Sequence, residues 1–180
     1  MIDKLHHRLA VEADAPALKA LMAAAMAENL KPFLPPELIA ASYAVMGLDT
    51  TLIADRTYWT IYAGDDLVGC GGWSRRATLY GGDHSAGRSA ALLDPAVDAA
   101  RVRAMYTHPV WVRRGVGSLI LRLCEEAAAK EGFSRLELMA TLSGEPLYRA
   151  RGFAALERLE DGGVPLVRMT KRIVAAPAAS

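Results

Sequence analysis

The stretch that decides the fold of this chain is Met105-Tyr106-Thr107-His108-Pro109-Val110-Trp111-Val112-Arg113-Arg114-Gly115-Val116-Gly117-Ser118. It starts as an apolar run typical of a strand, turns at a proline and passes through two glycines into a segment with helical periodicity. Backbone N–H groups in the first turn of a helix have no partner within the helix, and the helix dipole adds positive charge there. The stretch therefore predicts a strand, a turn and a helix N-terminus suited to a phosphate group.

Three kinds of phosphate-binding turn have this general form, and residue types exclude two of them. A Walker A loop needs Gly-Lys followed by Ser or Thr, a sequence that this turn lacks. A dinucleotide-binding fingerprint needs a third glycine three residues after Gly117, where the chain has Ile120. Taken alone, Gly115 and Gly117 would also suit an ordinary tight connection between a strand and a helix.

A second motif, Tyr148-Arg149-Ala150-Arg151-Gly152-Phe153, follows after the helix and a further apolar run. Together the two motifs resemble those of the GNAT (Gcn5-related) N-acetyltransferases, whose phosphate-binding turn is the third kind. In that family the turn reads Gln or Arg, any two residues, Gly, any residue, then Gly or Ala, and a Tyr-X-X-X-Gly-Phe sequence follows. Val112 departs from the first position, and Arg113 beside it is a candidate replacement. The resemblance covers the element order over residues 9–169, with sharp motifs only between residues 105 and 153.

The resemblance implies how the chain would hold acetyl-CoA as a co-substrate. The backbone of Met105, Tyr106 and Thr107 would pair with the pantetheine arm like a further strand. Thr141, where the family often has Asn, would offer a hydroxyl to the cofactor, and Tyr148 would give a proton to the departing CoA thiolate. The pyrophosphate would be held by the amides of six consecutive residues: Arg113, Arg114, Gly115, Val116, Gly117 and Ser118.

The periodicity of the remaining sequence agrees with this fold. Apolar residues recur at helical spacing after Asp14, an expected N-cap, and residues 75–100 are rich in Gly, Ser and Ala, which predicts a long loop. We expect helices over residues 15–28, 37–46, 117–131 and 145–151, and strands over 58–63, 67–73, 101–107, 135–141 and a final pair. The expected class is α/β (α+β): a GNAT-like mixed, mostly antiparallel sheet of six to seven strands with about four helices. We expect one domain over residues 1–174 and a flexible tail over 175–180.

Composition excludes several classes of function. The 21 Lys and Arg residues nearly balance 20 Asp and Glu residues, so no global field favours nucleic acid or an anionic membrane. Cys70 and Cys124 lack the spacing of zinc ligands, which predicts reduced, buried thiols and no metal. The N-terminal residues show no secretory signal, and no apolar run is long enough to span a membrane, so we expect a cytoplasmic protein. A homodimer is compatible with such a fold, and the sequence does not decide it.

These observations favour an N-acetyltransferase that moves an acetyl group from acetyl-CoA to a primary amine by direct attack in a ternary complex. The acceptor would be a small molecule or a peptide amine. A non-catalytic acyl-CoA-binding regulatory module is the alternative from a different class, and the presence of Tyr148 argues against it. The base that takes the proton of the amine is left open, with Glu28, His84 and His108 as titratable candidates.

The acceptor pocket is the part of the site that the sequence specifies least. Arg75, Arg76 and Arg88 belong to the long loop, where they either favour an anionic acceptor or form a solvated face. Trp73 precedes that loop and is either a core aromatic residue or part of the acceptor pocket.

Overall fold

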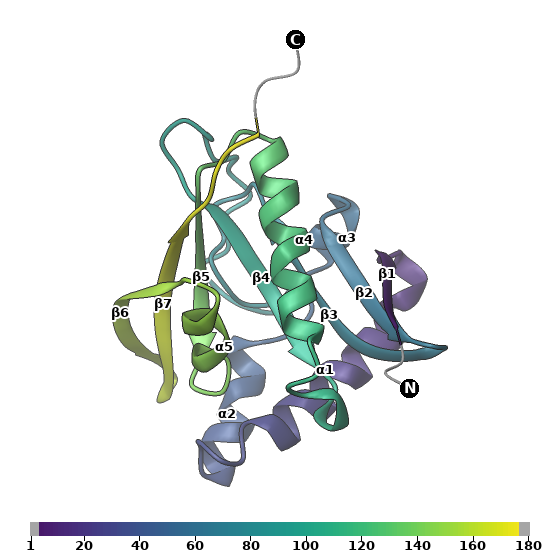
Figure 1. Cartoon of the computed structure of the whole chain (residues 1–180). Coiled ribbons are helices and arrows are strands. Elements are labelled where there is room, and N and C mark those ends of the chain that lie inside the picture. The colour runs from purple at the N-terminus through teal and green to yellow at the C-terminus, as the bar shows by residue number, and fades with distance from the viewer. Residues whose placement is uncertain (1–3, 177–180) are drawn as a thin grey trace.

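The computed structural model describes residues 4–176 and, within them, forms one seven-stranded sheet in the order β1-β2-β3-β4-β5-β7-β6 (Figure 1). The strands are β1 (Leu5–Leu9), β2 (Tyr58–Ala63), β3 (Asp66–Ser74), β4 (Ala100–Thr107), β5 (Arg135–Thr141), β6 (Ala154–Asp161) and β7 (Val164–Arg172). All neighbours pair antiparallel except β4 and β5, which are parallel. The expected mixed, mostly antiparallel sheet is confirmed.

Five α-helices lie within the same residues: α1 (Ala15–Asn29), α2 (Pro36–Val45), α3 (Thr50–Ala54), α4 (Val116–Lys130) and α5 (Glu145–Ala150). Four of them match the expected helices to within two residues at each end. The fifth, α3, is too short for a periodic pattern to reveal it. Its N-cap is Asp49, whose carboxylate accepts the N–H of Thr51 at 3.0 Å.

The start of α1 corrects one detail of the sequence analysis. Asp14 precedes the helix as expected, but its side chain makes no capping bond to the helix. A short 3-10 turn (Glu12–Asp14) comes first, so the carboxylate accepts the N–H of Val11 at 2.8 Å and pairs with Arg8 at 2.7 Å. Residues 177–180 of the expected tail lie outside the described residues.

Helices cover both faces of the sheet, and each face has its own apolar core (Figure 1). On one face α4 contributes Ile120 and Cys124 to a core that includes Leu136 and Leu138. On the other face α1 contributes Leu18 and Met22, which pack with Tyr58 and Cys70. Both cysteines are buried and free, as expected.

Glycines in β3 allow α4 to pack directly on the strand backbone. A Cβ atom at Gly69 would overlap the side chain of Val116, and one at Gly71 would lie 2.7 Å from Cγ2 of Ile120. Because contacts this short cannot be accommodated in a close-packed core, the two glycines fix the distance between helix and sheet. They thereby position the N-terminus of α4 over the middle of the sheet.

Ion pairs hold the long loop between β3 and β4 onto the rest of the molecule. Arg75 pairs with Glu131 at 2.7 Å and Arg76 with Asp55 at 2.7 Å. Arg88 pairs with Asp49, which is 2% exposed and also receives Arg103 at 3.0 Å. The loop arginines therefore have carboxylate partners that hold the loop in place, while each side chain remains partly exposed to solvent.

We expect Asp49→Asn to lower the free energy of unfolding by about 3 kcal/mol, because it leaves two guanidinium groups without their buried counter-charge. Urea denaturation followed by circular dichroism measures the change. The matched control is Glu126→Gln, which removes an exposed pair with Arg122 at 3.7 Å and should cost less than about 1 kcal/mol. Equal, small losses in both variants would contradict a structural role for the Asp49 pairs.

Candidate functional site

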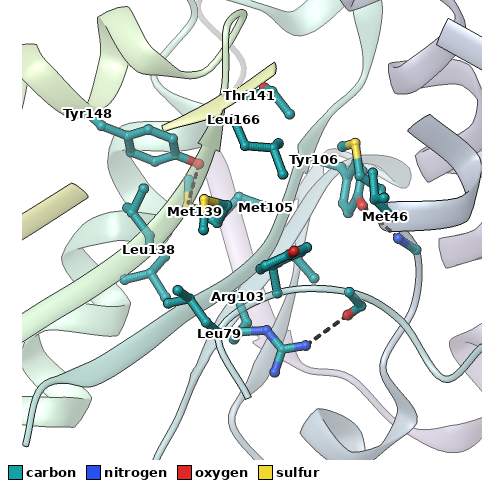
Figure 2. A pocket seen from close by; sticks show the side chains of 16 residues that line it. Met46, Leu79, Arg103, Met105, Tyr106, Leu138, Met139, Thr141, Tyr148 and Leu166 are labelled. Carbon is teal, nitrogen blue, oxygen red and sulfur yellow. Dashed lines mark hydrogen bonds between the residues drawn. The ribbon is translucent and has the colours of Figure 1, made fainter. Parts of the chain in front are cut away.

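The candidate site lies where β4 and β5 separate. The two strands pair only through Ala100–Leu136 and Arg101–Glu137 in the described chain, and beyond these positions they diverge (Figure 1). A cavity fills the opening, and we call it the β4–β5 cleft (Figure 2). Its walls come from β4, β5, β7 and α5, together with residues 45–47 at the end of α2 and residues 79–81 of the long loop.

A bulge in β4 shapes the floor of the β4–β5 cleft. Ala104 has a φ of 49°, and the register with β3 shifts between Cys70 and Gly72. An extra residue in one strand leaves the ladder locally disrupted and redirects nearby side chains. Here Met105 lies in the cleft, as Figure 2 shows.

The other two β4 residues of the expected site have partners in neighbouring elements. Tyr106 is 7% exposed, and its hydroxyl accepts the N–H of Gly47 at 3.1 Å. The carbonyl of Thr107 accepts a bond from the side chain of Asn29 at 2.9 Å. Both contacts link the end of β4 to the helices on the α1 face.

The turn before α4 presents a series of backbone donors. Within residues 4–176, no N–H group of residues 113–118 donates to a protein acceptor, and the first helical bond runs from Leu119 to Gly115 at 3.0 Å. Gly115 has a φ of 89°, a left-handed conformation that favours glycine. Helix α4 begins at Val116, one residue earlier than expected. Free amides at the positive end of a helix dipole form an anion site.

Basic side chains surround this turn. The guanidinium of Arg114 lies 5.0 Å from the ring centroid of Trp111, and Arg113 is exposed with a φ of 60°. Ser118 accepts bonds from Arg151 at 2.7 and 3.1 Å, so the second motif supplies a cation to the first. The local charge is positive although the chain as a whole is nearly neutral.

The tyrosine of the second motif reaches the bulge of β4. Tyr148 is 9% exposed on α5, stacks edge to face on Phe153 at 5.9 Å, and places its hydroxyl 3.8 Å from the sulfur of Met105 (Figure 2). Burial, with a smaller contribution from Cys124, raises the pKa of the Tyr148 phenol above its ordinary value. The hydroxyl therefore keeps its proton throughout the neutral range.

Thr141 ends β5 at the rim of the β4–β5 cleft. Its hydroxyl accepts the N–H of Gly144 at 3.2 Å and shares a hydrogen bond with Ser143 at 3.1 Å. These bonds close the turn into α5, and the start of that helix sets the position of Tyr148. In the structure Thr141 thus shapes the turn and also lines the cavity.

The three candidates for a general base do not line the β4–β5 cleft, although the ring of His84 lies next to Gly47 in its wall. Glu28 forms an exposed pair with Lys31 at 2.9 Å, His84 contacts the carbonyl of Tyr43 at 2.9 Å, and His108 accepts the N–H of Val110 at 3.3 Å. Among the described residues, the cavity lining includes none of the three.

Trp73 also lies away from the cleft. It is 2% exposed and packs edge to face against Phe133 at 6.0 Å, so it is a core residue and not part of an acceptor pocket.

Neither cysteine is suited to nucleophilic catalysis. Burial raises the pKa of Cys70 to about 12 and also raises that of Cys124, and a thiol that keeps its proton is a poor nucleophile. Over residues 4–176 the structure contains no group of three or more His, Cys, Asp or Glu side chains placed to hold a metal ion. No helix in the described chain has the length and apolar character needed to cross a membrane.

Sequence reasoning missed the residues that form the far end of the β4–β5 cleft: Met46, Leu79, Tyr80, Arg103, Met139 and Leu166. They come from five separate stretches of the chain. The loop that carries Leu79 and Tyr80 has no periodic pattern, so no signal in the sequence could have placed it over the sheet.

A split mixed sheet, a helix N-terminus with free amides and a buried phenol at the split define an acyl-CoA-dependent acyltransferase. The model of the acetyltransferase (GNAT) family matches residues 18–153, and the chain belongs to this family. It is an N-acetyltransferase, and enzymes of this family use acetyl-CoA.

Individual relatives agree with this assignment. The chain is 30% identical over 146 residues to the uncharacterized N-acetyltransferase YsnE of Bacillus subtilis, covering 77% of this chain and 82% of that protein. Its fold resembles a GCN5-related N-acetyltransferase from Rhodopseudomonas palustris with a TM-score of 0.68 at 20% identity, covering 96% and 98% of the two chains. It also resembles the PaiA N-acetyltransferase of Thermoplasma acidophilum, solved with coenzyme A, with a TM-score of 0.66 at 13% identity and coverage of 94% and 99%.

We expect Ser118→Asp to weaken acetyl-CoA binding by about tenfold, because it places a negative charge among the free amides where a pyrophosphate would lie. The same change should slightly stabilise the fold, since a carboxylate in the first turn of a helix interacts favourably with its dipole. Calorimetric titration and thermal unfolding measure the two effects. Ser118→Asn is the matched neutral control and should keep near-normal affinity. This position is preferable to Gly117, where a new Cβ atom would lie 2.5 Å from Leu147.

Proposed function

We propose that this enzyme transfers an acetyl group from acetyl-CoA to a primary amine by direct attack within a ternary complex. The observation that carries the proposal is the meeting of two distant motifs. The hydroxyl of buried Tyr148 lies beside Met105, at the point where β4 leaves β5 and its edge becomes free. This arrangement supports a role for Tyr148 as proton donor to a ligand extended along that strand edge.

The cofactor would bind along the turn and the strand in one extended conformation. The free amides of residues 113–118 would hold its pyrophosphate, with Arg113 and Arg114 at the rim. The pantetheine arm would then pair with the open edge of β4 at residues 105–107, a form of strand addition. Thr141 at the end of β5 would offer its hydroxyl from the opposite wall.

The reaction forms a carbon–nitrogen bond and breaks the carbon–sulfur bond of the thioester. The lone pair of a neutral amine attacks the carbonyl carbon, and a backbone N–H of β4 stabilises the developing oxyanion. As the intermediate collapses, the C–S electron pair goes to sulfur and Tyr148 supplies a proton to the thiolate. The attacking nitrogen releases one proton to water as it becomes the amide, and a proton from water restores the phenol of Tyr148. Because the pKa of the Tyr148 phenol is raised, the hydroxyl stays protonated at neutral pH. The phenol would lose its proton only at a pH above the ordinary tyrosine range.

The first test of the proposal is calorimetric titration of the purified protein with acetyl-CoA, beside matched titrations with ATP and NAD. We expect saturable binding of acetyl-CoA alone, followed by release of free thiol when amines are added. Binding without thiol release for any amine would favour the non-catalytic acyl-CoA-binding module. Absence of binding in a folded sample would overturn the proposal.

The second test addresses the proton donor. We expect Tyr148→Phe to lower kcat by about 100-fold, because general acid catalysis contributes a factor of this order or more. Affinity for acetyl-CoA should change little, since the ring and its packing on Phe153 remain. Single-turnover thiol release and calorimetry measure the two quantities. Unaltered turnover in a variant with normal affinity would exclude Tyr148 as the acid.

A further inference from the structure

Beyond Tyr148, the β4–β5 cleft continues into a chamber that the chemistry assigned above does not use. We call this part the acceptor chamber, and it lies between residues 45–47, residues 79–81 and the sheet. Aliphatic and thioether side chains line it together with polar groups of the strands and the loop. The side chains that supply this surface are Met46, Leu79, Leu138, Met139 and Leu166, and Figure 2 shows them around the cavity.

One guanidinium, that of Arg103, faces this chamber among the lining residues, and its charge is already matched. It donates to Asp49 at 3.0 Å and to the carbonyls of Gly81 at 2.8 Å and Thr78 at 3.3 Å. Asp49 in turn receives Arg88 from the far side. An acceptor with a second ammonium group would therefore meet a cation at this wall and find the adjacent carboxylate occupied.

The other carboxylate near the chamber also has a partner. Asp161, the last residue of β6, accepts the hydroxyl of Tyr80 at 2.8 Å. Tyr80 closes the chamber from the long loop, so the bond ties that loop to the last two strands of the sheet. A cationic acceptor would have to break this bond to gain a counter-ion, and burying an unpaired ammonium in apolar surroundings is costly.

The titratable groups that face the chamber do not accept protons near neutral pH. Burial raises the pKa of Tyr148 and of Tyr106, and burial together with Asp161 raises that of Tyr80. Burial lowers the pKa of Arg103, and the contact with Asp49 opposes that shift. An amine in this chamber has apolar walls and protonated phenols around it, and such surroundings favour its neutral form over the ammonium.

We propose, on the basis of the proposed function, that the acceptor is a weakly basic primary monoamine on an apolar body, which enters the chamber in its neutral form. The α-amino group of an amino-acid amide or of a peptide with an apolar first residue belongs to this class. The amine loses its proton to water before it binds, and the chamber selects the neutral species. Diamines and other polycationic amines are rejected.

The test compares kcat/KM as a function of pH for two acceptors of matched carbon skeleton, leucinamide and 3-methylbutylamine. Ordinary pKa values are about 7.7–8.0 for an α-amine and about 10.4 for an alkylamine such as the lysine side chain. We expect the inflection of kcat/KM to move with the pKa of the acceptor, and leucinamide to be favoured at least about tenfold at pH 7.5. A single inflection shared by both amines would reveal an enzyme base and overturn the proposal.

Variants of the chamber wall provide an independent test with 1,5-diaminopentane. Leu79→Glu or Met139→Glu adds a counter-ion, so each should raise the ratio of diamine to leucinamide turnover at least about tenfold. The matched control is Leu92→Glu, on the same loop but 68% exposed, which should leave the ratio unchanged. Equal turnover of diamine and leucinamide by the unmodified enzyme would overturn the proposal. Failure of the proposed function is distinguishable, because thiol release would then be missing with every amine.

Discussion

The early end of the β4–β5 pairing is the constraint on which the rest of this structure depends. Two residue pairs hold the strands together, and then the sheet opens although its core continues on both faces. Unpaired backbone groups inside a protein are costly unless a partner satisfies them. The free edge of β4 therefore leaves backbone groups that an extended ligand could pair with, and the proposed acyl-CoA arm has amide groups suited to this pairing.

Packing explains why the anion-binding turn lies beside this opening. Helix α4 directly follows β4, and Gly69 and Gly71 let it approach the backbone of β3. Buried Val116 fixes the first helical residue against the sheet, so the free amides before and after it are held in a defined place. Sheet, helix and turn thus pack together, and α5 with its C-cap residue brings Tyr148 and Arg151 to the same edge.

Sequence reasoning reaches those parts of the candidate site that are continuous in the chain. The turn of residues 113–118 and the motif beginning at Tyr148 are each continuous in the sequence, so their residue types alone indicate the chemistry expected of them. The acceptor chamber is different, because it forms only when residues 45–47 and 79–81 fold onto β4. Short helix α3 and the ion pairs of Asp49 arrange that folding, and neither has a periodic signal. The sequence does not show the partners of Arg75, Arg76 and Arg88, because their carboxylates lie far away in the chain and approach only in the folded structure.

The Asp49 cluster links the stability of the fold to the chemistry of the chamber. Arg103 sits at the wall of an apolar cavity, where an unpaired cation would be expensive. Its bonds to Asp49, Gly81 and Thr78 anchor the long loop, and they also occupy the Asp49 carboxylate, so that a cationic ligand finds no free counter-ion there. A loop held by hydrophobic contacts alone would leave no cation at this wall. The guanidinium that fastens the loop is therefore also what disfavours a second positive charge on the acceptor.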